Sequence, residues 1–308
     1  MTRVTFIVGC TAGGKESLGM ALAKATGGQI VSVDSMKIYR RMDIGTAKAS
    51  AADRRAVAHH CIDLVEPSEN FSVGRYVEAT DAAIAAIAAA GSPVLAVGGT
   101  PLYVKALSEG LFEGPAADPA LRAALKARAA VEGLAALHRD LAALDEAAAA
   151  RIHPNDEKRI IRALEVHALT GRPISELQRQ WDAGGGRYDC LFIGIRRGRE
   201  DANGRINRRV RRMIDQGLRD EVAALLAEPA GLSAQAAQAV GYAEMIDHLQ
   251  GRCGLDEAVE RIKINTRQLA KHQRTWFRRF PVQWIDAEPD TPAEAIAERA
   301  LAIMRTSK

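Results

Sequence analysis

The chain has 308 residues, of which 47% are hydrophobic and 5% aromatic, and its formal net charge is +4. This length accommodates one large α/β domain with an insertion, or two domains, and the apolar content is enough for a sizeable core. No stretch approaches the roughly 20 uncharged apolar residues of a membrane span, and no signal peptide is recognisable at the N-terminus. The four cysteines are scattered without a CxxC pair, which predicts reduced thiols in a cytoplasmic protein.

Short apolar strands alternate with helices in the first hundred residues. Runs of β-type residues predict buried strands at 4–8, 29–33 and 93–97, and apolar residues at helical spacing predict helices over 15–25 and 73–90. This alternation is typical of a parallel sheet with crossover helices.

Three junctions follow these strands: the loop that starts at Gly9, the pair Asp34-Ser35, and the triplet Gly98-Gly99-Thr100. Ligands of parallel sheets bind at the carboxyl ends of the strands. We therefore expect all three junctions to face one site.

From Asp118 to about residue 180 the sequence predicts several short helices and no clear strand. Asp118-Pro119 is typical of a helix start, with Asp as the cap and Pro in the first turn. Three glycines at 184–186 follow, a strand is expected at 190–195, and the rest is mostly helical with a short strand at 282–285. The predicted organisation is a core made of residues 1–115 and 187–308, interrupted by an all-helical insertion at 116–186.

Residues 9–15, GCTAGGK, match the phosphate-loop pattern G-x-x-x-x-G-K between a predicted strand and a predicted helix. Such a loop points backbone amides at phosphate oxygens, and the helix dipole and a lysine add positive charge. The residues that we assign to this anion site are Gly9, Thr11, Ala12, Gly13, Gly14 and Lys15.

The next position departs from the pattern, because Glu16 stands where a Ser or Thr hydroxyl normally ligates Mg²⁺. Glu16 could ligate Mg²⁺ directly or through water, since hard cations favour carboxylates, whereas Ser17 is expected to point elsewhere. A nucleotide hydrolase would also need an acid at the end of a second apolar strand to hold Mg²⁺ and water. The predicted strand at 93–97 is followed by glycines instead, and the acid that follows a predicted strand is Asp34. Asp34 could position a metal or act as a general base.

Two helical segments carry long cationic faces. No Asp or Glu occurs between Arg261 and Arg279, and at 100° per residue five cations there share a stripe about 80° wide. A second segment places arginines on one face and apolar residues on the other. Long cationic faces without acidic residues indicate a protein that binds a polyanion such as nucleic acid. The five cations are Lys263, Arg267, Lys271, Arg274 and Arg278, and the second face holds Arg205, Arg208, Arg209 and Arg212.

Blocks along nearly the whole chain resemble the bacterial tRNA dimethylallyltransferases, also called tRNA isopentenylpyrophosphate transferases. The matching blocks are 9–15, 33–36 with 38–40, 42–48, 59–63, 98–100 with 102–103, 151–156, 162–165 with 170–173, 217–218 with 221–222, 241–242 with Glu244, 266–271, Gln273 and 275–278. The resemblance implies a P-loop kinase-like α/β core with a helical insertion, and Mg²⁺ as cofactor.

The reaction that the resemblance implies is transfer of a prenyl group from dimethylallyl diphosphate to N6 of an adenosine next to the tRNA anticodon, with release of pyrophosphate. Asp34 matches the family's base, and Thr100 matches a threonine near the leaving oxygen. Arg205 or Arg208 could clamp the pyrophosphate. The residues that the resemblance assigns to tRNA contact are Asp34, Ser35, Met36 and Lys37, together with Lys158, Arg159, Ile160, Ile161 and Arg162.

Three other functions use the same features: a small-molecule kinase, a non-enzymatic RNA-binding protein, and an enzyme that prenylates free adenine nucleotides. The kinase has no use for two basic faces, and those faces with the insertion favour tRNA over a free nucleotide. Glu16 is the feature that favours a non-enzymatic relative. The expected protein is a monomer that binds the anticodon arm and no membrane.

Overall fold

A computed structural model of the chain describes residues 1–111, 114–178 and 186–307. They form two compact units, one of Met1–Ser108 with Arg187–Lys308 and one of Glu109–Gly186. The helical unit begins before the predicted residue 116, and the carbonyl of Pro115 accepts a hydrogen bond from Arg162 of that unit at 2.9 Å. Of the three boundary glycines, Gly184 and Gly185 lie outside the described residues.

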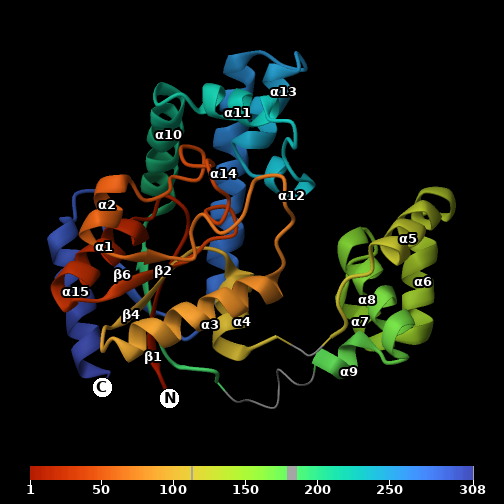
Figure 1. Ribbon diagram of the computed structural model, residues 1–308, viewed down its shortest axis with the longest axis horizontal. Helices are drawn as coiled ribbons and strands as arrows, with labels where there is room; N and C mark the ends of the chain where they lie inside the picture. The colour runs from red at the N-terminus through yellow and green to blue at the C-terminus, as the bar shows by residue number, and fades with distance from the viewer. Residues whose placement is uncertain (112–113, 179–185, 308) are drawn as a thin grey trace. The chain divides into compact units, whose positions relative to one another are not determined.

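The core is built on a six-stranded sheet in the order β3-β2-β4-β1-β5-β6, in which every neighbouring pair is parallel (Figure 1). The strands expected from the sequence are present within a residue or two, and β3 adds a short edge strand. The strands are β1 (Arg3–Val8), β2 (Gln29–Val33), β3 (His59–His60), β4 (Val94–Gly98), β5 (Asp189–Arg196) and β6 (Gln283–Asp286).

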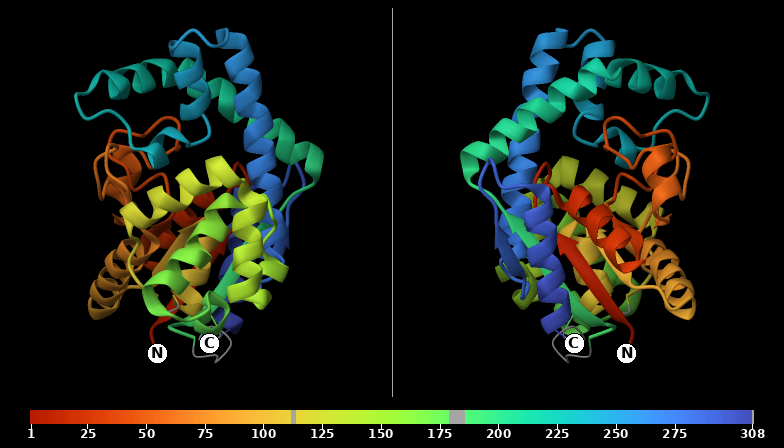
Figure 2. Two further views of the ribbon diagram at one scale, coloured as in Figure 1. Left: turned by 90° about the vertical axis from the view of Figure 1, so that its right-hand side faces the viewer. Right: turned by 90° about the vertical axis from the view of Figure 1, so that its left-hand side faces the viewer.

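Alternate residues of each strand face opposite sides of the sheet, so its two faces have separate apolar clusters. On one face Ile7 of β1 packs with Leu22 of α1 and Ile296 of α15. On the other, Phe6 packs in the cluster that contains Ile84 of α3 and Phe277 of α14. Helices α1 and α15 lie side by side over the first face (Figure 2, right).

The core helices cover both faces and extend beyond the carboxyl ends of the strands. They are α1 (Lys15–Thr26), α2 (Ala51–Ala56), α3 (Val73–Ala89), α4 (Pro101–Glu109), α10 (Arg199–Asp215), α11 (Leu218–Ala227), α12 (Ala234–Ala237), α13 (Tyr242–Leu249), α14 (Leu255–Phe277) and α15 (Ala293–Thr306). Within the described ranges, no helix is both long enough and apolar enough to cross a membrane.

The second unit consists of short helices around an apolar core, as expected. Its helices are α5 (Pro119–Glu132), α6 (Leu134–Leu144), α7 (Glu146–Arg151), α8 (Glu157–Thr170) and α9 (Ile174–Gln178). The carboxylate of Asp118 caps α5 by accepting from the amides of Ala120 and Leu121 at 2.9 and 3.0 Å. The fully buried Glu165 is ion-paired with Arg122 and Arg162, which offsets the cost of burying its charge.

Candidate active site

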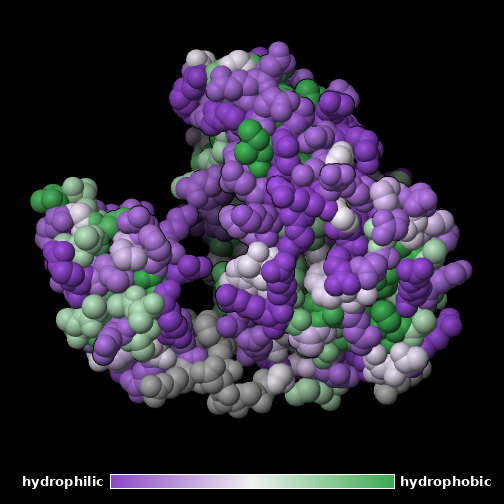
Figure 3. Space-filling view, turned by 180° about the vertical axis from the view of Figure 1, so that it is seen from behind, coloured by the Kyte–Doolittle hydropathy of each residue, from purple (hydrophilic) through white to green (hydrophobic). Residues whose placement is uncertain are grey.

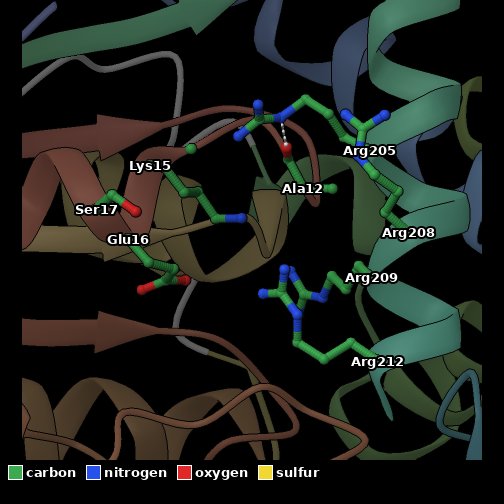
Figure 4. A pocket seen from close by; sticks show the side chains of 9 residues that line it. Ala12, Lys15, Glu16, Ser17, Arg205, Arg208, Arg209 and Arg212 are labelled. Carbon is green, nitrogen blue, oxygen red and sulfur yellow. Dashed lines mark hydrogen bonds between the residues drawn. The ribbon is translucent and has the colours of Figure 1, made fainter. Parts of the chain in front are cut away.

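The phosphate loop connects β1 to α1 and has the backbone that its sequence predicts. Gly14 caps α1 with a φ of 103°, a conformation that favours glycine. Ala12 also has a positive φ, of 59°, and its carbonyl accepts from Nε of Arg205 at 2.9 Å (Figure 4). The carbonyl of Gly13 accepts from Nε of Arg197 at 3.0 Å. Two loop carbonyls are thereby bound to arginines, and the N-terminus of α1 is left to attract an anion.

A cavity of about 280 Å³ lies between this loop and α10, and five basic side chains and one acidic side chain line it. Both predicted clamps, Arg205 and Arg208, line the cavity. Arg209 and Arg212 from the same helix face join them and reach towards Lys15 (Figure 4). Helical spacing placed all four arginines on one face, but only the first two were predicted to bind the pyrophosphate.

Positively charged side chains are concentrated around this cavity, which favours the binding of an anion. Burial lowers the pKa of Lys15, and the nearby cations Lys37 and Arg209 lower it further, against the opposing effect of Glu16. Burial likewise lowers the pKa of Arg209, although Glu16 and Asp34 oppose this shift. A ligand with several negative charges would relieve the repulsion among these cations.

A second cavity, of about 300 Å³, brings together the three strand junctions expected to share a site. Its lining includes Thr11, Asp34, Ser35, Thr100 and Arg209. Because Arg209 lines both cavities, the two adjoin. The prediction that the carboxyl ends of β1, β2 and β4 face one site is confirmed.

Asp34 and Thr100 are held in place by neighbouring backbone. Oδ1 of Asp34 accepts from the amides of Met36 and Lys37 at 2.9 and 3.3 Å. Oγ1 of Thr100 accepts from the amide of Ser35 at 3.1 Å. Each side chain therefore has a defined position at the edge of the second cavity.

Gln273 of α14 connects two of these junctions. Its Oε1 accepts from the amide of Thr11 at 2.8 Å, and its Nε2 donates to the carbonyl of Gly99 at 2.6 Å. A Cβ on Gly99 would lie 2.5 Å from Nε2 of Gln273, so a larger residue at position 99 would displace this amide from its hydrogen bond. In the sequence, Gln273 was one of the blocks that resemble the family, and it was given no role in the site.

Two expectations at the loop need correction, those for Lys37 and Ser17. Lys37, expected to contact tRNA, is buried, and its Nζ lies 2.8 Å from Oε1 of Glu16. Glu16, the candidate metal ligand, is therefore ion-paired within the protein. Ser17, expected to point elsewhere, lines the loop cavity. Burial raises the pKa of Glu16, but Lys37 and Lys15 outweigh it, so the net shift is downward and the carboxylate stays ionised.

The cationic stripe of α14 is one residue shorter than predicted. Lys263 is buried and ion-paired with Glu260 at 2.6 Å, because its position turns towards the packed side of the helix. The other four cations line a groove of about 610 Å³ together with Arg199 and Asn203 of α10. The face of the core to which α14 contributes is largely hydrophilic (Figure 3). The four groove residues are Arg267, Lys271, Arg274 and Arg278.

On the insertion, the expected contact segment is only partly available. Ile160 and Ile161 of α8 are buried in the core of the helical unit, since helical periodicity turns them inward, so their side chains cannot contact RNA. Arg159 is ion-paired with Asp156, and Arg162 with Glu165.

Known proteins match this chain over nearly its full length. The family described as IPP transferase matches residues 37–280, and the one described as isopentenyl transferase matches residues 2–63. The tRNA dimethylallyltransferase of Geobacter metallireducens is 47% identical over 286 residues, 92% of this chain and 93% of that protein.

Solved structures agree with these sequence matches. The tRNA isopentenylpyrophosphate transferase of Bacillus halodurans is 38% identical, with a TM-score of 0.72 over 100% of this chain and 98% of that one. A eukaryotic dimethylallyltransferase acting on tRNA is 25% identical, with a TM-score of 0.85 over 99% of this chain and 79% of that one. The resemblance read from the sequence is confirmed, and the chain belongs to the IPP transferase family of tRNA-modifying enzymes.

Proposed function

We propose that this protein transfers a dimethylallyl group from dimethylallyl diphosphate to N6 of an adenosine next to the tRNA anticodon and releases pyrophosphate. The observation that carries the proposal is the junction of the two cavities at Arg209. A cation-lined cavity for a leaving diphosphate adjoins a cavity whose edge carries a carboxylate. A small-molecule kinase would need an acceptor site but not the cationic groove of α14.

Asp34 is the proposed general base. An exocyclic aromatic amine is a weak nucleophile, so a base must accept its proton as the C–N bond forms. Asp34 borders the cavity and is oriented by two backbone amides. A positioned base of this kind contributes about 10²- to 10⁴-fold to a rate. The target base would have to leave the stack to reach it, at a cost of a few kcal/mol.

The leaving group gains negative charge as the C–O bond breaks. Amides of the loop, Lys15 and the α10 arginines are the proposed donors that stabilise this charge. Arg205 has one nitrogen committed to the carbonyl of Ala12, whereas Arg209 borders both cavities. We therefore assign the principal clamp to Arg209, with Arg205 bracing the loop. Thr100 is the proposed hydrogen-bond donor to the leaving oxygen.

We propose that three groups of residues contact the tRNA. They are Asp34, Ser35 and Met36 at the cavity, the four groove cations of α14, and the exposed residues Lys158 and Arg159 in the first turn of α8. The groove cations of α14 carry the positive charge that a phosphate backbone requires. Action as a monomer in the cytoplasm is part of the same proposal.

Mg²⁺ is the cofactor that the resemblance implies, and it stays a prediction. Glu16 stands in place of the usual hydroxyl ligand, and Lys37 occupies one of its carboxylate oxygens, so the side chains at the loop do not make the usual magnesium site. The steps proposed above use protein groups alone.

The test is to incubate the protein with dimethylallyl diphosphate and unmodified tRNA and to detect N6-isopentenyladenosine by mass spectrometry. The wild-type protein should form this product. Asp34→Asn should lower the transfer rate by about 10²- to 10⁴-fold while tRNA affinity, measured by filter binding, stays within a few-fold. Full turnover by Asp34→Asn would remove Asp34 as the base, and absence of product with the wild type would refute the proposed reaction.

A further inference from the structure

Glu16 stands in the wall of the diphosphate cavity, where a carboxylate should weaken anion binding. A carboxylate close to a diphosphate repels it, and the repulsion is stronger at a protein surface than in bulk water. The chain therefore needs a group that cancels this charge. A metal ion is one solution, and a protein cation is another.

The structure contains the protein cation. Nζ of Lys37 lies 2.8 Å from Oε1 of Glu16, and the lysine side chain is only 7% exposed, against 44% for that of Glu16. A buried ammonium is costly without a partner, so this pair is not an incidental surface contact. The carboxylate oxygen that faces Lys37 is engaged, and a divalent ion brought beside it would be repelled by the ammonium.

The backbone of Lys37 is fixed as well as its side chain. Its amide donates to Oδ1 of Asp34 at 3.3 Å, and its carbonyl accepts from the amide of Asp63 at 3.2 Å. The same turn thus orients Asp34 and holds the ammonium under Glu16. Neutralisation of Glu16 and placement of Asp34 are coupled through one segment.

We propose that the Glu16–Lys37 pair takes the place of the hydroxyl–metal unit of a phosphate loop, so that this enzyme binds diphosphate without a divalent metal at Glu16. Lys37 is a positioning residue: it does not line the cavity, and it acts by neutralising Glu16. The cations that meet the diphosphate are Lys15 and the arginines of α10. The inference rests on the proposed use of this cavity for the leaving diphosphate.

The test measures binding of inorganic pyrophosphate to the full-length protein by calorimetry, in EDTA and in millimolar Mg²⁺. The wild-type dissociation constants in the two buffers should agree within about threefold. Lys37→Gln exposes the carboxylate, so its affinity in EDTA should fall by about tenfold or more and recover with Mg²⁺. Removing both charges in Glu16→Gln/Lys37→Gln should restore binding in EDTA, as expected for a coupled pair.

Lys24→Gln is the matched control, because Lys24 is an exposed lysine of the same helix α1 as Glu16 and does not line the cavity. It should bind as the wild type does. A wild-type affinity that drops tenfold or more in EDTA would overturn the inference without any variant. Equal affinities of Lys37→Gln and wild type in EDTA would also overturn it. Wild type that binds pyrophosphate but forms no prenylated tRNA would instead count against the proposed function.

Discussion

Helices α10 and α14 both carry acid-poor cationic faces, yet the structure uses them differently. The arginines of α10 face the phosphate loop across a cavity of about 280 Å³, and Arg205 is bound to a loop carbonyl. The cations of α14 line a larger groove of about 610 Å³, and its buried side presents Gln273 to the loop. One helix concentrates positive charge at a small cavity, whereas the other spreads positive charge along a larger groove.

A cationic stripe in a sequence can therefore have two physical meanings. Crowded guanidinium groups repel one another. Burial lowers the pKa of Arg209 and the neighbouring Arg212 lowers it further, against the opposing effects of Glu16 and Asp34. Such a cluster is stabilised by a compact, highly charged ligand. Cations that are spread along a helix instead bind a polyanion through many weak contacts. The affinity of such binding should depend strongly on salt concentration. Substitutions in the two helices should therefore affect different measurements.

Among substitutions in these two helices, Arg209→Gln in α10 should have the largest effect. It removes the guanidinium that borders both cavities, so the prenyl-transfer rate constant in single-turnover assays should fall by about 10²- to 10³-fold, as on loss of a charge-stabilising donor. The affinity for tRNA should change by less than a few-fold. A variant that lost tRNA affinity and kept its rate constant would assign Arg209 to the RNA surface instead.

Replacing the four groove cations of α14, Arg267, Lys271, Arg274 and Arg278, by glutamine should weaken tRNA binding by about 10- to 100-fold at low salt. The slope of the logarithm of affinity against the logarithm of salt concentration should shrink by about 0.7 to 0.9 for each phosphate that the protein no longer neutralises. The rate at saturating tRNA should stay near that of the wild type. An unchanged salt slope would show that RNA does not lie along this groove.

The smallest effect is expected for Lys263→Gln, the matched single-charge control on the same helix. Lys263 is buried and ion-paired with Glu260, so its replacement should alter tRNA affinity by less than about threefold and leave the salt slope unchanged. A fall in affinity as large as that of a groove residue would return Lys263 to the RNA surface, where the sequence had placed it.

The strands, the phosphate loop and Asp34 at a strand end could be predicted because each depends on local pattern: β-type apolar runs, glycines before Lys15, and an acid directly after an apolar strand. The family followed from ordered blocks such as 42–48 and 266–271. The start of α5 at Pro119 was equally local, since Asp118 caps it by its own side chain. Helix faces were predicted well where they were strongly amphipathic, as for α10.

Local patterns in the chain were thus enough to predict the fold class, the anion loop, the position of the candidate base and the family of this protein. The tertiary structure alone decided the partners of charged and polar side chains: that Lys37 neutralises Glu16, that Lys263 turns inward, and that Gln273 joins the loop to Gly99. The physical reason is that an ion pair or a buried hydrogen bond can join residues far apart in the chain, and its energy depends on distance and burial. Neither quantity can be read from spacing along a sequence.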